Sequence, residues 1–166
     1  MKQLKMLMIG NSFSEDTVRY VYDIAYAAGI EKVIVCNMYI GGCSLYTHCK
    51  NALNNTSAYD FQTYENGEWK HNTEKTLGYG IKYADWDYIS LQQSSGLSGI
   101  PSSYACLQNL MEYVKKTATN GNFEFVWNMT WAYQQNSTHG DFAKYGLNQT
   151  AMYNAIVNTV RSQIID

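Results

Sequence analysis

The stretch that decides the fold is Leu4–Ser14, which reads LKMLMIGNSFS. Its first part is mostly apolar, and a short apolar run that ends at a glycine is typical of a buried strand. The polar residues that follow, from Asn11 onward, precede a segment with helical spacing. We therefore predict a strand that ends at Gly10 and a helix soon after it, with Ser12 at the junction.

Apolar spacing in the rest of the chain predicts further elements. Helices are expected at about 15–28, after Pro101, and at about 149–164, and Gly29 suits the C-terminal cap of the first. Residues 44–76 are the least regular, with a hairpin expected around Asn66-Gly67. The predicted strands are 4–9, 33–38, 86–91 and 123–129.

The alternation of strands and helices predicts an α/β fold. We expect a flavodoxin-like, three-layer α/β/α domain with a parallel sheet whose strand order is 2-1-3-4. Ligands of such folds bind at the carboxyl ends of the strands. The polar clusters that fall there are Asn11-Ser12, Gly41-Gly42, Gln92-Gln93 and Thr130-Trp131.

Charge and hydropathy exclude two classes of partner. The formal net charge is −2 and no basic run stands out, whereas a nucleic-acid-binding protein needs clustered Lys and Arg. No apolar stretch approaches the roughly 20 residues needed to cross a membrane. The apolar residues after Met1 lead directly into Gly10 and are read as a strand, so a cytoplasmic location is expected unless a leader has been removed.

The four cysteines show no paired Cys-x-x-Cys spacing. Cys36 lies in a predicted strand, where a buried free thiol is expected. Cys43, His48 and Cys49 fit no standard zinc spacing, so we expect neither a metal nor another cofactor. The sequence does not define an oligomeric state.

Ser12 has two interpretations. A serine between a strand and a helix can attack an acyl carbon while backbone N–H groups at the helix N-terminus hold the oxyanion. However, Ser12 and Glu15 also form the S-x-x-E pattern of a capping box, so Ser12 could simply be the N-cap. Ser14 is an equally good cap, and that alternative leaves Ser12 free.

Four stretches together resemble SGNH/GDSL-type hydrolases, and in particular an uncharacterised bacterial SGNH-like family. The resemblance spans nearly the whole chain and rests on the order of the stretches as much as on any one of them. They are Gly10–Ser14, Tyr39–Leu45, Ser90–Gln93 and Thr130–Gln135.

The resemblance implies roles for several residues. Ser12 would be the nucleophile, and the N–H of Gly42, preferred over Gly41, would join the oxyanion hole. The usual Asn donor of the third block is absent, so Gln93 is the first candidate for its amide and Gln92 the second. The expected substrate contacts are Asn11, Gln92, Trp131 and His139.

One departure from the family concerns the general base, which SGNH enzymes carry in a late Asp-x-x-His segment after a fifth strand. None of His48, His71 and His139 stands in that context, and His139 also reads as a polar loop residue or a substrate contact. We therefore expect the 166 residues to be a single SGNH-like domain that lacks its C-terminal strand and its base.

Three functions remain open at this point. The first is a serine esterase that acts through a Ser12 acyl-enzyme, with a small-molecule or carbohydrate ester as substrate. The second is a non-catalytic domain that binds a carbohydrate or another ligand in the same pocket. The third is an anion or nucleotide binder, although the chain lacks both G-x-G-x-x-G and a Walker lysine.

Overall fold

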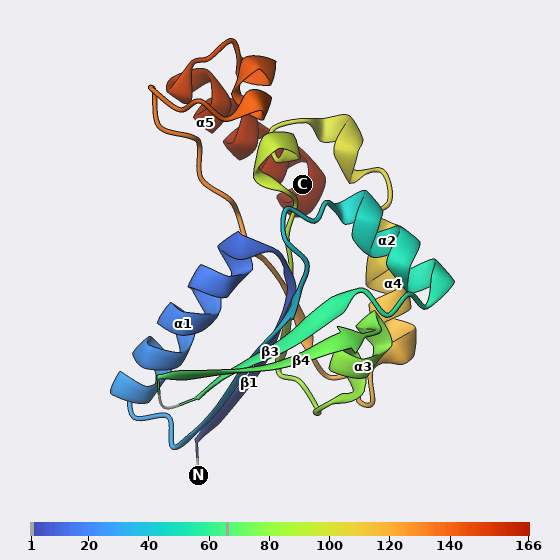
Figure 1. Ribbon diagram of the computed structural model, residues 1–166. Coiled ribbons are helices and arrows are strands. Elements are labelled where there is room, and N and C mark those ends of the chain that lie inside the picture. Colours follow the sequence, from blue (N-terminus) through green and yellow to red (C-terminus); the bar gives the residue numbers. More distant parts are fainter. Residues whose placement is uncertain (1, 66) are drawn as a thin grey trace.

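The structure is a computed structural model that describes residues 2–65 and 67–166. Within these residues the chain forms a three-layer α/β fold around a mostly parallel sheet of six strands (Figure 1). The strands lie in the order β4-β3-β2-β1-β5-β6. Their bounds are β1 (Gln3–Gly10), β2 (Lys32–Tyr39), β3 (Tyr59–Glu65), β4 (Glu68–Lys75), β5 (Tyr88–Leu91) and β6 (Glu124–Trp127).

The strand order differs from the expected order 2-1-3-4 because the sheet has more strands than the apolar pattern predicts. β1 pairs in parallel with β2 and β5, and β5 pairs in parallel with β6. The hairpin β3–β4 pairs antiparallel with β2 and extends the sheet on that side. The sequence predicts this hairpin but not that it joins the sheet. Asn66 of the expected turn lies outside the described residues, and Gly67 has a left-handed φ of 81°.

The described residues also contain helices that the sequence does not predict. Residues 44–76, expected to be irregular, contain a helix as well as the hairpin, and a further helix begins at Leu77. The first of these, α2, buries a mixed face that includes His48 and Asn51, and polar residues on a buried face weaken the apolar pattern. The helices are α1 (Ser12–Ala27), α2 (Leu45–Asn54), α3 (Leu77–Lys82), α4 (Leu107–Thr117) and α5 (Gln149–Val160), with 3-10 turns η1 (Ser95–Leu97), η2 (Pro101–Tyr104) and η3 (Gly140–Tyr145) and a π-helical turn η4 (Arg161–Ile165).

The alternation of side chains along β1 separates two hydrophobic cores. Met6 and Met8 face α1, whose Val18 and Tyr22 pack against them. The side chains between them, such as Leu7, face the opposite layer, where α2, α3 and α4 cover the sheet (Figure 1). The carboxyl ends of β1, β2, β5 and β6 therefore lie together at one edge of a sheet that is covered on both faces.

The last helix packs against the short turn that precedes it rather than against a further strand of the sheet. Its buried residues Met152, Ile156 and Val160 form a third core with Phe142 and Tyr145 of η3. Figure 1 shows α5 beyond the carboxyl edge of the sheet rather than over one of its faces. The chain that follows β6 thus builds a separate layer above the edge where ligands of this fold class bind.

A row of polar side chains is buried between α1 and the sheet. The Ser14 hydroxyl lies 2.9 Å from Asn37 Oδ1, and Asn37 Nδ2 donates to Gln62 Oε1 over 2.9 Å. Gln62 Nε2 in turn donates to Asp60 and Glu15. A buried polar group lowers the stability of the fold unless it has a hydrogen-bond partner. This row therefore holds α1 against β2 and β3, and loss of any one residue would leave a neighbour unpaired.

We expect Asn37→Ala to lower the free energy of unfolding by about 1–3 kcal/mol, because it leaves the buried Gln62 Oε1 without a donor and removes one of the two acceptors near the Ser14 hydroxyl. Urea denaturation followed by circular dichroism measures this. Asn54→Ala, at an exposed position on α2, is the control and should change the stability by less than about 0.5 kcal/mol. Equal losses in the two variants would contradict the proposed importance of the row.

His48 is a second buried polar residue, on the α2 face that meets β3. Its Nδ1 lies 3.0 Å from the Tyr59 hydroxyl, and its Nε2 has no partner among the described residues. Burial lowers the pKa of His48 to about 4 from an ordinary value of 6.5. His48 belongs to no group of three or more His, Cys, Asp or Glu that could hold a metal, and the described residues contain no such group.

The lowered pKa of His48 predicts a pH dependence of stability. Between about pH 6.5 and pH 4 the unfolded histidine is protonated while the folded one is not, so stability should fall as the pH is lowered through this window. The loss should approach about 1.4 kcal/mol per pH unit. In His48→Gln, urea denaturation at several pH values should show a shallower decline, whereas the exposed-site control His139→Asn should decline like the parent chain.

Candidate active site

Ser12 is the first residue of α1 and lies at the carboxyl end of β1 with its side chain exposed. The helix begins earlier than the predicted residue 15. Its cap is neither Ser12 nor Ser14 but Asn11, whose Oδ1 accepts the N–H of Phe13 over 3.1 Å. Both capping alternatives from the sequence are therefore wrong. No hydrogen bond within the described residues occupies the Ser12 hydroxyl, which leaves it free for chemistry.

Asn11 joins three segments of the chain at this point. It is 2% exposed, and besides capping α1 its Oδ1 accepts from Gln92 Nε2. Its Nδ2 donates to the Cys43 carbonyl oxygen over 3.1 Å. The sequence predicts Asn11 as a substrate contact, and the structure places it behind the site with its amide engaged on both sides. It brings the ends of β1 and β5 and the loop after β2 together.

Gln92 is held between Asn11 and a residue that the sequence analysis missed. Asn128 Nδ2 donates to Gln92 Oε1 over 3.0 Å, and Asn128 Oδ1 accepts from Thr17 of α1 over 3.3 Å. Asn128 directly follows β6, as Gln92 directly follows β5, and this shared position was the available signal. A Cβ on Gly10 would lie 2.6 Å from Gln92 Oε1, so only glycine leaves room for the glutamine.

Gln93 points to different partners. Its Oε1 accepts from the N–H groups of Leu45 and Ser94 at 3.0 and 2.8 Å. Its Nε2 lies 3.0 Å from both the carbonyl and the hydroxyl oxygen of Ser103. Gln93 thus connects the start of α2 to η2, and the structure does not bring its amide to Asn11.

The Gly41-Gly42 loop forms a tight turn in which the Cys43 N–H donates to the Ile40 carbonyl over 3.2 Å. Gly42 is exposed and has a left-handed φ of 62°, which glycine adopts without steric cost. None of the hydrogen bonds within residues 2–65 and 67–166 uses the backbone N–H of Ser12 or Gly42. The bond from Asn11 to Cys43 holds this turn beside the start of α1.

Trp131 and His139 lie on the segment that follows β6. The Trp131 ring packs against Phe13, with 4.3 Å between the ring centroids, and its side chain is 57% exposed. His139 is farther along and caps η3, its Nδ1 accepting from the Asp141 N–H over 3.2 Å. Its ring also packs on Tyr133 at 4.6 Å. No hydrogen bond, ion pair or ring contact within the described part of the chain joins His139 to Ser12.

The other two histidines pair with residues of β3. His48 pairs with Tyr59 under α2, and His71 on β4 lies 2.6 Å from an Asp60 carboxylate oxygen. Within the described residues, the exposed Ser12 hydroxyl and the Ser12 and Gly42 N–H groups have no hydrogen-bond partner, and Asn11 links the start of α1 to the loop before α2 and to the buried Gln92 amide. These are the elements that acyl transfer requires, apart from a base.

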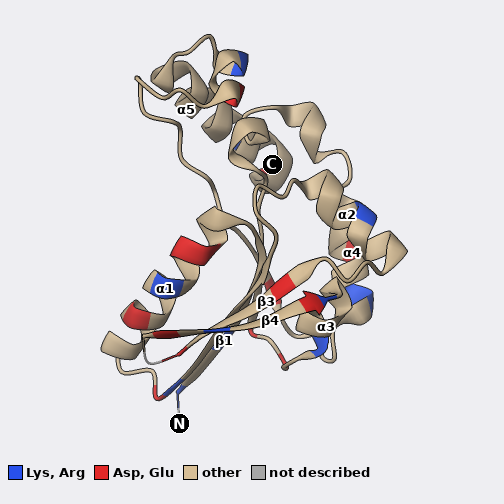
Figure 2. Cartoon of the chain, viewed as in Figure 1, with Lys and Arg blue, Asp and Glu red and all other residues tan. Residues whose placement is uncertain are grey.

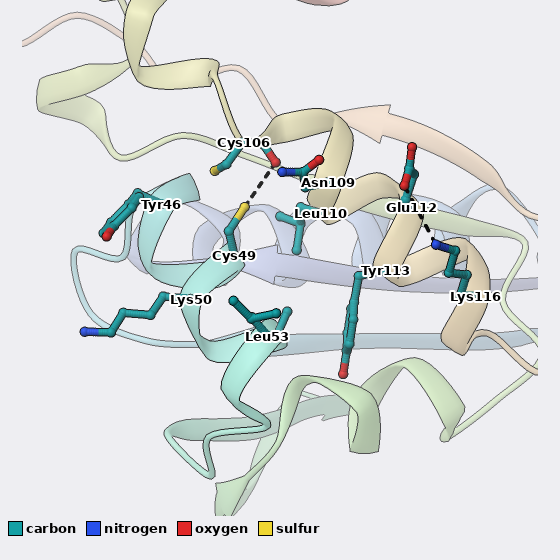
Figure 3. Close-up of a pocket in the computed structure, with 11 residues that line it drawn as sticks. Tyr46, Cys49, Lys50, Leu53, Cys106, Asn109, Leu110, Glu112, Tyr113 and Lys116 are labelled. Atoms are coloured by element: carbon teal, nitrogen blue, oxygen red, sulfur yellow. Dashed lines mark hydrogen bonds and ion pairs between the residues drawn. The ribbon is translucent and has the colours of Figure 1, made fainter.

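An apolar hollow of about 470 Å³ lies elsewhere, between α2 and α4 (Figure 3). The Cys49 thiol in its wall donates to the Cys106 carbonyl oxygen over 3.1 Å, and an ion pair of Glu112 and Lys116 borders it. It contains none of the predicted site residues, so we place the candidate site at the carboxyl edge of the sheet. Across residues 2–65 and 67–166, no helix has both the length and the apolar character of a membrane span.

Solved structures resemble the chain, among them the following two. A DUF4886 family protein from Bacteroides uniformis ATCC 8492 is 38% identical with a TM-score of 0.91, over 98% of this chain and 63% of that protein. This chain thus spans less than two thirds of that relative. A protein from Slackia heliotrinireducens described as a putative SGNH hydrolase is 17% identical with a TM-score of 0.56, over 98% of this chain and 74% of the other, and this likeness concerns the fold alone.

No curated protein matches the chain in sequence. The family described as "Domain of unknown function (DUF4886)" matches residues 5–165. This match covers nearly the whole chain and agrees with the resemblance to the Bacteroides uniformis protein. The chain therefore belongs to the DUF4886 family.

Proposed function

We propose that this protein is a serine esterase of SGNH type in which Ser12 attacks the acyl carbon of an ester. The observation that carries the proposal is the exposed Ser12 hydroxyl at the start of α1, which remains free because Asn11 takes the capping role. The N-terminus of a helix favours developing negative charge, and the tetrahedral intermediate carries such a charge next to the attacked carbon.

The oxyanion in this proposal is held by the N–H groups of Ser12 and Gly42 and by the Gln92 amide. Gln92 Nε2 carries two hydrogens and uses one for Asn11, so the second is available. The Gln93 amide is engaged with Ser103, and we assign it the positioning of α2 and its preceding turn. The hydrogen bonds thus favour Gln92 over Gln93 as the donor.

No histidine in the described residues forms a hydrogen bond with the Ser12 hydroxyl, so the general base has to be sought elsewhere. His139 accepts a hydrogen bond at Nδ1, so a neutral His139 carries its proton on Nε2 and cannot accept the Ser12 proton there without losing the cap of η3. We therefore propose that the base comes from a segment outside the 166 residues, for which the longer Bacteroides uniformis relative provides a precedent in length. Without a base, only residual catalysis from the oxyanion hole and binding is expected.

A non-catalytic ligand-binding domain is the second candidate, and the hydrogen bond that engages His139 Nδ1 with Asp141 rather than with Ser12 favours it. An organophosphonate that reacts with nucleophilic serines distinguishes the two. If Ser12 is the nucleophile, peptide mapping after prolonged exposure should find the adduct on Ser12, and Ser12→Ala should abolish it. Labelling that survives in Ser12→Ala, or no labelling at all, would contradict the esterase proposal and favour the binding domain.

We expect the 166-residue chain to hydrolyse p-nitrophenyl acetate barely above background, with Ser12→Ala removing the remainder. His139→Ala should leave the rate unchanged, because the His139 ring caps η3 and forms no hydrogen bond with Ser12 in the described residues. Initial rates measured against buffer test both statements. Strong turnover that His139→Ala abolishes would identify His139 as the base and contradict its assignment as a cap.

The two glutamines should differ in their effect on Ser12. Gln92→Met, which keeps the size and removes the donors, should slow phosphonate labelling by as much as 10²-fold, the scale of a lost oxyanion donor. Gln93→Met should slow it less but lower the thermal midpoint, because it releases Leu45 and Ser103. Circular dichroism confirms folding in each case. A larger loss of labelling in Gln93→Met would reverse the assignment.

A further inference from the structure

Two exposed aromatic side chains line an open hollow next to the candidate site. Trp131 and Tyr153 are 57% and 55% exposed, and they border a hollow of about 470 Å³. Its remaining wall is Ala132 with Gln149 and Thr150 from the first turn of α5. Large aromatic surfaces that stay exposed around one concavity mark interaction sites more often than scattered apolar residues do.

The hollow is linked to the first turn of α1 by one ring contact. The Trp131 ring packs on Phe13, which directly follows Ser12 in α1. Figure 1 shows the segment after β6 passing the N-terminal end of α1 on its way to α5. A molecule seated against Trp131 would therefore have Ser12 within reach of its edge.

The lining chemistry is neutral. None of the five residues around the hollow is charged, and the nearby Asp141 carboxylate is paired with Lys144 at 2.6 Å. Figure 2 shows few charged residues around α5 and the carboxyl edge. The polar groups that the hollow offers are the Gln149 amide and the Thr150 hydroxyl, which donate and accept hydrogen bonds but favour no ionic ligand.

The segment that carries Trp131 is held in place before any ligand binds. Gln135 Nε2 donates to the Leu147 carbonyl over 2.8 Å, and Gln135 Oε1 accepts the Gln149 N–H over 3.0 Å. The Tyr133 hydroxyl lies 2.7 Å from Ser95 Oγ. The Trp131 segment is thus tied both to α5 and to η1, which lowers the entropy cost of binding against it.

We propose that the hollow between Trp131 and Tyr153 is a subsite for one neutral pyranose ring, so that the substrate is an acylated sugar. The C–H faces of a sugar ring pack on aromatic rings, and its hydroxyls need neutral donors and acceptors such as Gln149 and Thr150 at their edge. An aryl ligand would stack equally well but would not use those groups. The position of the ester beside Ser12 rests on the proposed esterase function. Binding of the sugar ring to the hollow does not.

Binding can be tested without any turnover. In a ¹⁵N-labelled chain, the indole N–H signal of Trp131 is the one that disappears in Trp131→Ala. Titration with methyl β-D-glucopyranoside and methyl β-D-xylopyranoside should shift this signal saturably with at least one sugar, and should leave the buried Trp86 unmoved. Tyr153→Ala should raise the Kd about tenfold.

Tyr20→Ala is the matched control, because Tyr20 is 63% exposed on α1 and does not line the hollow. It should leave the Kd unchanged. No saturable shift with either sugar would overturn the proposal. So would a Trp131 signal that responds to benzyl alcohol and to neither sugar, which would identify an aryl subsite instead.

Hydrolysis by a form of the protein that includes the proposed base supplies an independent arm with glucose pentaacetate and glycerol triacetate, which share the acyl group and differ in the ring. Trp131→Ala should lower kcat/KM for the sugar ester about tenfold more than for the glycerol ester. Equal losses would overturn the subsite while leaving the esterase standing. Sugar binding through Trp131 without phosphonate labelling of Ser12 would instead sustain the subsite and overturn the esterase.

Discussion

The buried amide of Asn11 is the interaction on which the rest of the site depends. It caps α1, accepts from Gln92 and donates to the carbonyl of Cys43, so three segments meet at one side chain. An aspartate at this position could still cap the helix and accept from Gln92. It would, however, turn a carboxylate oxygen toward the Cys43 carbonyl, and two acceptors repel each other. The asparagine is therefore matched to the loop after β2.

The parallel strands could be predicted because each is a short, mostly apolar run bounded by glycine or polar residues. The same reasoning placed Ser12, Gly42 and Gln92 at one edge. This reasoning failed where the buried side chains are polar. Because α2 buries His48 and Asn51, its sequence lacks the apolar spacing of an amphipathic helix. The S-x-x-E pattern also misled, because Asn11, one residue earlier, has the better geometry to cap the helix.

Other features of the site were outside the reach of local sequence. The side chains of the two adjacent glutamines point in different directions. Only the fold shows that Gln92 bonds to Asn11 while Gln93 bonds to Ser103. The role of Asn128 depends on a partner 36 residues earlier. The separate core of α5 likewise needs Phe142, which lies on a short 3-10 turn that apolar periodicity does not reveal.

The hairpin has a consequence for how the protein behaves in a crowded solution. It makes β4 the outermost strand on its side, and an outermost strand offers unpaired backbone groups to other chains. β4 carries Glu68, Lys70, His71, Glu74 and Lys75, most of them exposed. A second molecule docking edge to edge would have to strip water from these charges. The strand thus protects the sheet from aggregation, a task separate from the chemistry at its carboxyl edge.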